Sequence, residues 1–237
     1  MKGLSPKIVS GCSRKGAGLE KINPGQTYQP VIADACQDYR TAIERAVRVL
    51  LSGGIVAYPT ESFYGLAVDA TNEHAIRRLF LLKKRDIDSP VLILIPSKDM
   101  IGQYAAHISP LALRLMEDFW PGGLTIIFEA GPTISSLLTA GTGKIGIRLS
   151  SHPVATGLAM AIGVPITGTS ANISGETACV DAKEVSNAFS TGINLILDGG
   201  KTQGGKGSTI LDITEDRPRL LREGIVTRED LKDYLSV

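Results

Sequence analysis

Apolar residues recur at helical spacing along much of the chain. The first such stretch has the i, i+3, i+4, i+7 spacing of an amphipathic helix, and its apolar positions are Ala42, Ile43, Ala46, Val47, Leu50 and Leu51. Gly53 and Gly54 are expected to end this helix. Capping residues predict further helices at about 72–83 (Asn72), 109–120 (Ser109 and Pro110) and 152–162 (closed by Gly163), and helices opening at Asp181 and Thr227.

Between the predicted helices lie short apolar runs that are typical of buried strands. They are expected at 55–58, 91–95, 124–128, 145–149, 165–168 and 193–197, and a closing pair at 208–213 and 219–222. Strands that alternate with helices indicate an α/β fold, and the late strand pair indicates a twisted mixed sheet with flanking helices.

The domain organisation follows from where these patterns begin. Residues 1–38 carry Gly, Pro, Ser and Lys with weak periodicity and are predicted to be an N-terminal extension with room for a short strand. Residues 39–237 are predicted to form one domain, because no linker or repeat divides them. The N-terminus has basic residues but no apolar segment, so it is not a secretory signal, and a cytoplasmic location is expected.

Composition narrows the class of protein. The chain has 25 Lys and Arg against 24 Asp and Glu, a formal net charge of +1, which argues against binding to nucleic acid through bulk charge. Aromatic residues are only 5%, which argues against a stacking platform for single strands. Cys12, Cys36 and Cys179 lie far apart without CxxC spacing, so neither a disulfide framework nor a zinc site is predicted. Glycine is abundant, with 26 residues, and suits tight turns around a ligand.

A polar segment, 59–66, follows the predicted strand at 55–58. Thr60, Ser62 and Tyr64 offer hydroxyls and Glu61 offers a carboxylate, at the end of a strand where α/β sheets bind ligands. The alternative is a polar turn around a caged tyrosine.

Basic residues stand at two positions of interest. Lys83, Lys84 and Arg85 end a predicted helix, where they either form a solvated, dipole-favoured terminus or grip a phosphate. Arg148 shares one face of a predicted strand with Gly146, and an arginine inside a sheet needs an anionic partner. That partner is either a structural carboxylate or a ligand.

Two glycine- or hydroxyl-rich segments complete the candidates. Residues 200–207 nearly match the P-loop, but Gly207 replaces the magnesium-binding hydroxyl and a strand follows instead of a helix. A flexible loop or a lid over a site is the better interpretation. Residues 167–172 suit close backbone approach to a ligand or an Asn-capped turn. No catalytic triad or zinc-hydrolase motif is present.

Together these segments resemble the YrdC-type threonylcarbamoyl-AMP synthase family in its single-domain form. Eight segments occur in the family's order: PTESFYGLA at 59–67, KKRDIDSPV at 83–91, FWPGGLT at 119–125, IGIRLSSHP at 145–153, TSANISG at 169–175, DGG at 198–200, STILD at 208–212 and LLREG at 220–224. The order and spacing make the resemblance specific, although each segment alone is weak.

The resemblance implies a nucleotidyltransferase, L-threonylcarbamoyladenylate synthase. Such enzymes join L-threonine, bicarbonate or CO2 and ATP and release pyrophosphate, and their product feeds formation of N6-threonylcarbamoyladenosine at tRNA position 37. The implied fold surrounds a concave, positively charged cleft. ATP is a substrate, Mg²⁺ its expected companion, and downstream tRNA-modification proteins the expected partners. A membrane is not expected, and the basic cleft leaves room for weak RNA binding.

The resemblance also assigns roles to residues. Ser62, Arg148, Gly168 and Ser208 match positions that contact L-threonine. Positions that contact ATP are matched by Lys83, Arg85, Ser89, Lys144, Ser170, Asn172 and Arg222. Lys83, Arg85 and Arg148 are the expected catalytic residues, and no metal ligands are assigned. The chain departs from the family's commonest pattern at Ser62-Phe63, Asp86, Ser89, Leu94 and Gly123.

Other functions compete with this interpretation. A non-catalytic RNA-binding module would use the same basic cleft, although the net charge and the few aromatic residues speak against it. A P-loop NTPase would depend on Lys206. A different carbamoyl-transfer role, as in hydrogenase-maturation relatives, would usually come with extra domains.

Overall fold

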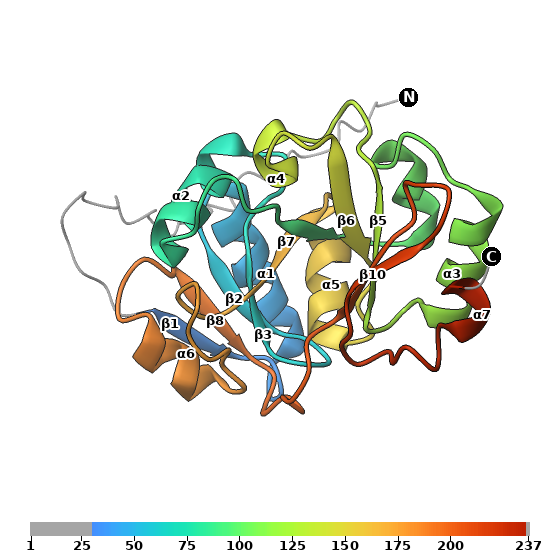
Figure 1. Cartoon of the computed structure of the whole chain (residues 1–237). Coiled ribbons are helices and arrows are strands. Elements are labelled where there is room, and N and C mark those ends of the chain that lie inside the picture. Colours follow the sequence, from blue (N-terminus) through green and yellow to red (C-terminus); the bar gives the residue numbers. More distant parts are fainter. Residues whose placement is uncertain (1–29, 236–237) are drawn as a thin grey trace, which may run out of the picture.

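The computed structural model describes residues 30–235, and ten strands among them form one mixed sheet (Figure 1). Its order is β1-β8-β2-β3-β7-β4-β6-β5-β9-β10. The strands are β1 (Val31–Asp34), β2 (Val56–Pro59), β3 (Tyr64–Ala67), β4 (Leu92–Leu94), β5 (Leu124–Glu129), β6 (Lys144–Arg148), β7 (Ile166–Ser170), β8 (Leu195–Asp198), β9 (Thr209–Asp212) and β10 (Arg219–Arg222). The predicted α/β class with a mixed sheet and flanking helices is confirmed.

The helices are α1 (Tyr39–Leu51), α2 (Glu73–Lys83), α3 (Pro110–Phe119), α4 (Ser136–Thr139), α5 (Pro153–Ile162), α6 (Ala182–Ala188) and α7 (Lys232–Leu235), with a 3₁₀ helix, η1, at Lys98–Gln103. Four helices, α2, α3, α5 and α6, begin where the sequence predicts, whereas α4 and the 3₁₀ helix are not predicted. Asn72, Ser109, His152 and Asp181 each accept a backbone N–H of the first turn through their side chain. Thr227 exchanges the predicted capping bonds with Asp230, but α7 begins only after them.

Two strands add to the expectation. β1 is a short strand within the expected N-terminal extension, which had room for one, but it joins the main sheet, where it pairs in parallel with β8 and forms one edge. Residues 1–29 lie outside the described part. β3 falls in the segment predicted as a polar turn, yet it pairs with β2 and β7. All four of its residues are buried, so it has no apolar and polar alternation to mark it as a strand.

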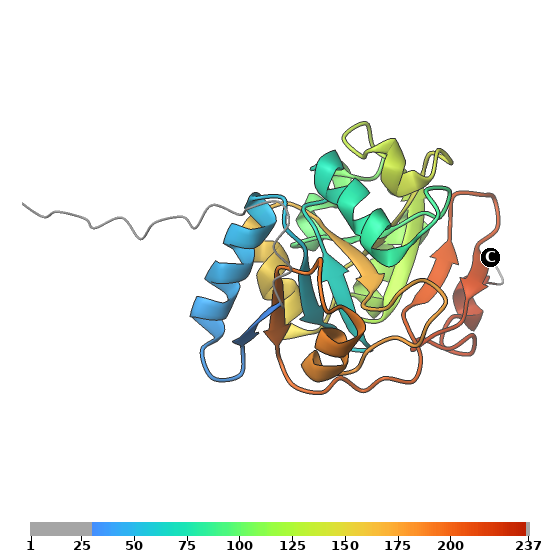
Figure 2. The same cartoon turned by 90° about the vertical axis from the view of Figure 1, so that its left-hand side faces the viewer.

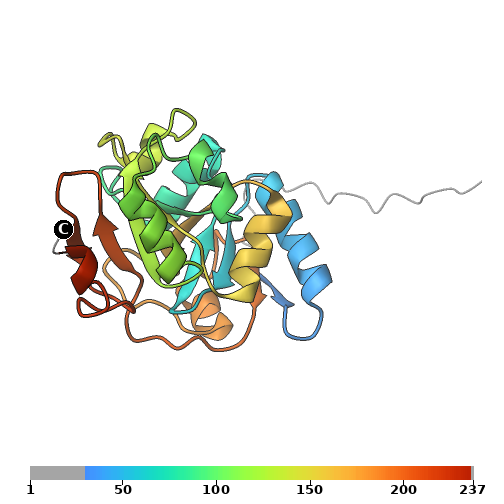
Figure 3. The same cartoon turned by 90° about the vertical axis from the view of Figure 1, so that its right-hand side faces the viewer.

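Helices cover the β1-β8-β2 end of the sheet on both faces. α1 and α5 lie side by side on one face (Figure 3), where Leu50 and Leu158 pack with Val56 and Leu195. Ile196 points to the opposite face and belongs to a second apolar core with α2 and α6. In residues 30–235 no helix combines the length and apolarity needed to cross a bilayer.

The other end of the sheet has one packed face and one open face. Leu124, Ile126, Ile147 and Leu211 of β5, β6 and β9 point into the core with α3. The alternate residues of these strands point the other way, since successive side chains of a strand face opposite sides. Figure 2 shows the β9-β10 pair at the opposite side of the molecule from β1 and α1. The open face at the end formed by β5, β6 and β9 carries the candidate site.

Candidate active site

A cavity of about 550 Å³ opens over the sheet at β5, β6 and β9. Its floor consists of every second residue of these strands, namely Thr125 and Ile127, Lys144, Gly146 and Arg148, and Ile210 and Asp212. Strand register places Ile127 opposite both Gly146 and Asp212. Polar groups from three strands are thereby brought into one layer.

Glycines keep the floor close-packed where β4 meets its neighbours. A Cβ on Gly168 would lie 2.3 Å from Cδ1 of Leu92, its partner across the β4-β7 ladder. A Cβ on Gly146 would lie 3.1 Å from Cβ of Leu92 and from Cγ2 of Thr125. Leu92 thus fills the space that side chains at these glycines would need, and the backbone of both glycines lines the cavity.

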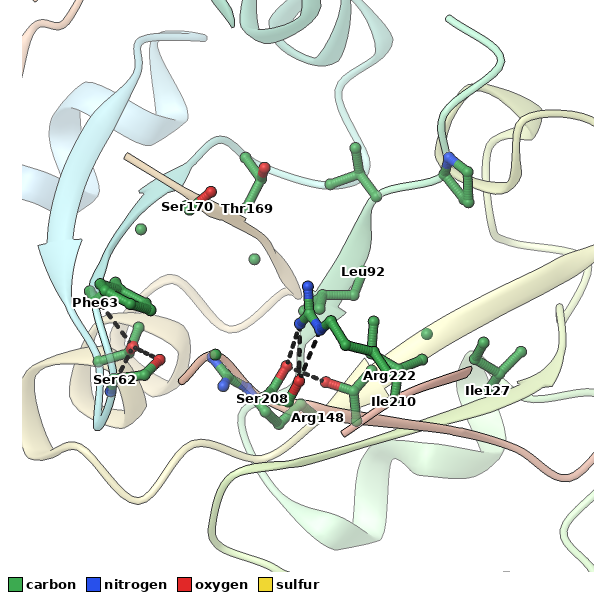
Figure 4. Close-up of a pocket in the computed structure, with 18 of the residues that line it drawn as sticks. Ser62, Phe63, Leu92, Ile127, Arg148, Thr169, Ser170, Ser208, Ile210 and Arg222 are labelled. Carbon is green, nitrogen blue, oxygen red and sulfur yellow. Dashed lines mark hydrogen bonds between the residues drawn. The ribbon is translucent and has the colours of Figure 1, made fainter. Parts of the chain in front are cut away.

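The rim of the cavity comes from turns and strand ends. Ser62 and Phe63 of the β2-β3 turn lie on one side, Ser170 at the end of β7 lies above, and Ser208 and Arg222 lie on the other side (Figure 4). Arg85 also lines the cavity, and its guanidinium donates to the carbonyls of Ser89 (3.3 Å) and Pro90 (2.7 Å).

Arg148 has a structural carboxylate as its partner. Its Nη1 donates to Oε1 of Glu61 at 2.6 Å, and both side chains are largely shielded, with 6% and 14% of their surfaces exposed. Within the described chain its Nε is buried without a hydrogen-bond partner. The arginine, which lines the cavity, therefore retains a hydrogen-bond donor that the described part of the protein does not use.

Ser208 joins two strands on the opposite wall. Its hydroxyl accepts from Thr125 Oγ1 at 2.9 Å and from Arg222 Nη2 at 3.3 Å, while its carbonyl accepts from both Nε and Nη2 of Arg222. Figure 4 shows Ser208 and Arg222 side by side, with Arg148 nearby. Burial, together with the charge of Arg148, lowers the pKa of Arg222. The guanidinium group of Arg222 on this wall is thus held near that of Arg148 on the floor.

Lys144 is neutralised by acidic neighbours. Its ammonium lies 3.1 Å from Asp212 and 3.3 Å from Glu215. Burial opposes ionisation of Asp212, but hydrogen bonds from Thr214 and Lys144 outweigh it and lower the pKa of this carboxyl.

Lys83 does not line the cavity, in contrast to the expected phosphate contact. It is only 1% exposed, and its ammonium donates to the carbonyls of Ser170 (2.5 Å) and Asn172 (2.6 Å) and to Asn172 Oδ1 (3.1 Å). α2 ends at Lys83, and Lys84 adopts a left-handed backbone with φ 50°. Because the backbone changes direction at Lys84, the two residues expected to bind phosphate together are separated: Lys83 is buried, whereas Arg85 lines the cavity.

Ser89 and Asn172, both expected at the nucleotide, also lie off the cavity wall. Ser89 supplies the carbonyl that holds Arg85. Asn172 accepts from the Ser170 hydroxyl at 2.6 Å and so fixes a side chain that does line the cavity.

The glycine-rich segment that resembles a P-loop connects β8 to β9 and contains no helix. Tyr64 donates to Gly200 O at 2.8 Å, and Gly204 N donates to Ser62 O at 2.7 Å. These two hydrogen bonds hold the glycine-rich segment against β3 and the β2-β3 turn at the edge of the cavity.

The described residues form no cluster of three or more His, Cys, Asp or Glu side chains suited to a metal ion. Asp212 is the only carboxylate among the described residues that line the cavity, and Lys144 and Thr214 already occupy it. These residues do not form a binding site for a divalent cation on their own.

The structure brings most of the expected residues together. Those that line the cavity are Ser62, Arg85, Lys144, Arg148, Gly168, Ser170, Ser208 and Arg222. Sequence reasoning left out Thr125, and it named Glu61 as a carboxylate of the 59–66 segment without connecting it to Arg148. Thr125 could have been found from strand alternation, because it is a polar residue on the face opposite Leu124 and Ile126.

The chain belongs to the Sua5/YciO/YrdC family, because the family model Sua5_yciO_yrdC, described as "Telomere recombination", matches residues 48–224. A threonylcarbamoyl-AMP synthase of Pyrococcus abyssi is 36% identical over 194 residues, which cover 82% of this chain and 57% of that protein. One of Vibrio vulnificus is 34% identical over 184 residues, which cover 77% of this chain and 98% of that protein.

A solved structure shares the fold. The crystal structure of P. abyssi Sua5 complexed with L-threonine superimposes with a TM-score of 0.82 at 33% identity, over 86% of this chain and 60% of that one. The chain thus spans little more than half the length of the archaeal relative. The relatives are named as enzymes, which does not favour the alternative of a non-catalytic RNA-binding module.

Proposed function

We propose that this chain is an L-threonylcarbamoyladenylate synthase, a nucleotidyltransferase whose catalytic domain spans residues 39–237. The observation that carries the proposal is the cavity, where Arg85, Arg148 and Arg222 converge with the hydroxyls of Ser62 and Ser208. Such a site suits an amino acid and a triphosphate. The resemblance to relatives of that name supports the choice of L-threonine, bicarbonate or CO2, and ATP.

The proposed reaction has two steps. The L-threonine nitrogen forms a bond to the carbon of CO2 and loses a proton to solvent, which gives a carbamate. A carbamate oxygen then attacks the α-phosphorus of ATP, the bond to the bridging oxygen breaks, and pyrophosphate leaves. No protein nucleophile is needed, so the protein's contribution is orientation and neutralisation of charge.

The cavity residues divide between the two substrates. Arg148 neutralises the carboxylate of L-threonine, while Ser62, Ser208 and the Gly168 backbone hold its other polar groups. Arg85, Arg222, Lys144 and the Ser170 hydroxyl take the phosphates. Lys83 and Asn172 do not contact a substrate in this proposal. They hold Ser170 in place through hydrogen bonds to its carbonyl and its hydroxyl.

The described residues of the cavity offer no ready ligands for Mg²⁺. The cavity lacks a free carboxylate among its described residues, so an ion that accompanies ATP would take its ligands mainly from phosphate and water. The product is proposed to pass to tRNA-modification proteins for position 37. A cytoplasmic location is part of the proposal, because the few, widely spaced cysteines fit a reducing compartment.

The test is direct detection of threonylcarbamoyl-adenylate by mass spectrometry, with pyrophosphate release, after L-threonine, bicarbonate and ATP are mixed with the protein. Arg148→Ala should reduce product formation by about 100-fold or more, because a buried charge-assisted contact is lost. Arg219→Ala is the matched control, since Arg219 is an exposed arginine of β10 paired with Glu215. Absence of product, together with salt-sensitive RNA binding, would support the RNA-binding module instead.

A further inference from the structure

Glu61 makes contacts that connect the β2-β3 turn with the end of β6, three strands away from β3 in the sheet. It lies in the turn between β2 and β3, and its two carboxylate oxygens are occupied by Arg148, the last residue of β6, and by Ser150, which follows β6. Oε1 accepts from Arg148 Nη1 at 2.6 Å, and Oε2 accepts from the Ser150 hydroxyl at 2.5 Å. Glu61 does not line the cavity, so its carboxylate acts on the protein and not on a substrate.

Ser150 is itself held in a fixed orientation. It is 2% exposed, and its hydroxyl oxygen accepts the backbone N–H of His152 at 3.1 Å, which leaves its proton for Glu61. His152 caps the start of α5 through its own side chain. The chain of contacts therefore runs from the start of α5 through Ser150 and Glu61 to Arg148.

The arginine is left with one free edge. A guanidinium is planar, and its Nε and Nη2 hydrogens lie on the same side, where they match the two oxygens of a carboxylate. Glu61 occupies only Nη1. Within the described residues Nε has no hydrogen-bond partner, and Nη2 makes no hydrogen bond either. The protein thus binds the end of the guanidinium and leaves the carboxylate-matching edge unused.

We propose that Glu61 is a positioning residue that fixes the Arg148 guanidinium so that its free edge receives the carboxylate of the amino-acid substrate. This inference rests on the proposed function and extends it to a residue outside the cavity wall. Without Glu61, Arg148 is a buried cation that can rotate toward other acceptors, and the geometry of the substrate contact is lost.

The experiment compares Glu61→Gln with Glu73→Gln in the full chain. Glu73 is a matched control, because it also accepts from a serine hydroxyl, Ser135 at 2.6 Å, and pairs with an arginine, Arg77, but at the protein surface. Binding of L-threonine is measured by calorimetry, KM for L-threonine and ATP is measured by product formation, and Tm is recorded for each variant.

Glu61→Gln should weaken binding of L-threonine and raise its KM by roughly 10- to 100-fold, with KM for ATP changed by less than about threefold, since misplacement of one contact affects the ligand it holds. Glu73→Gln should match the wild type. In an Arg148→Ala background, Glu61→Gln should add no further loss of threonine binding, because its effect passes through that arginine.

Two outcomes would overturn the inference. One is a lower Tm with both KM values unchanged, which identifies a purely structural ion pair. The other is that Glu61→Gln weakens threonine binding by the same factor in the wild type and in the Arg148→Ala background. Failure of the proposed function is a separate result, because the wild-type chain would then yield no threonylcarbamoyl-adenylate while calorimetry still reports how each variant binds L-threonine.

Discussion

Gly224 offers the sharpest test of how the cavity wall is built. It lies two residues after the end of β10, and a Cβ at this position would lie 2.1 Å from Gly207 O, 2.6 Å from Ser208 C and 2.7 Å from Thr209 N. All three atoms belong to the backbone that presents Ser208. Gly224 N also donates to Thr209 Oγ1 at 2.9 Å, so the two segments are held in contact.

Gly224→Ala should therefore destabilise the fold and the site together. The oxygen of Gly207 would have to move from 2.1 Å to at least 3.0 Å from the new methyl group. Overpacking of this kind costs about 3 kcal/mol when backbone must shift, which corresponds to a fall in Tm of about 6–12 °C for a chain of this size. The displaced segment carries Ser208, so KM for L-threonine should rise as well.

The assay is differential scanning calorimetry combined with steady-state kinetics. Gly102→Ala is the control, because its nearest neighbour to a Cβ is Ile108 Cδ1 at 4.0 Å. That variant should be neutral or slightly more stable, since alanine restricts the unfolded chain. If Gly224→Ala has a Tm within about 1 °C of the wild type and unchanged KM and kcat, the inference that the 207–209 backbone leaves no room for a side chain at Gly224 is wrong.

Two further substitutions probe the buried polar groups. Burial and the charge of Arg85 lower the pKa of Lys83 to about 8 from 10.5, so between these values the unfolded chain binds more protons and stability rises with pH. Urea unfolding should show this rise in the wild type and not in Lys83→Met, and parallel pH profiles would contradict it. Thr125→Val removes the 2.9 Å hydrogen bond to Ser208 and should raise KM for L-threonine about fivefold, corresponding to about 1 kcal/mol. Thr133→Val, which loses a comparable bond to Gln103 O at the surface, should leave kinetics unchanged.

Features that depend on local physics were predictable from the sequence. α2, α3 and α5 begin after Asn72, Ser109 and His152, because a side-chain cap satisfies backbone N–H groups within the same turn. β3 was not predictable in the same way. Its strand identity depends on pairing with β7, about 100 residues further along the chain, and on burial of all its side chains.

The candidate site shows the same limit. The strand pattern required an anionic partner for Arg148 but left a carboxylate and a ligand equally open, and only the packed sheet brings Glu61 to it across 87 positions of sequence. Lys83 and Arg85 stand two residues apart, and the sequence predicts that they act together. The left-handed backbone of Lys84 sends them to different places, and no composition or periodicity signals that turn.

The cavity floor depends on the parallel pairing of β5 with β9, whose strands lie far apart in the chain. During synthesis, Ser62 leaves the ribosome 160 residues before Arg222, an interval of about 8–30 s at ordinary translation rates. Until β9 emerges, the outer edge of β5 has no neighbouring strand, and the apolar side chains of β5 lack their contact with Leu211. The nascent chain thus carries an unpaired strand edge until β9 is made, and the cavity floor is complete only when β9 pairs with β5.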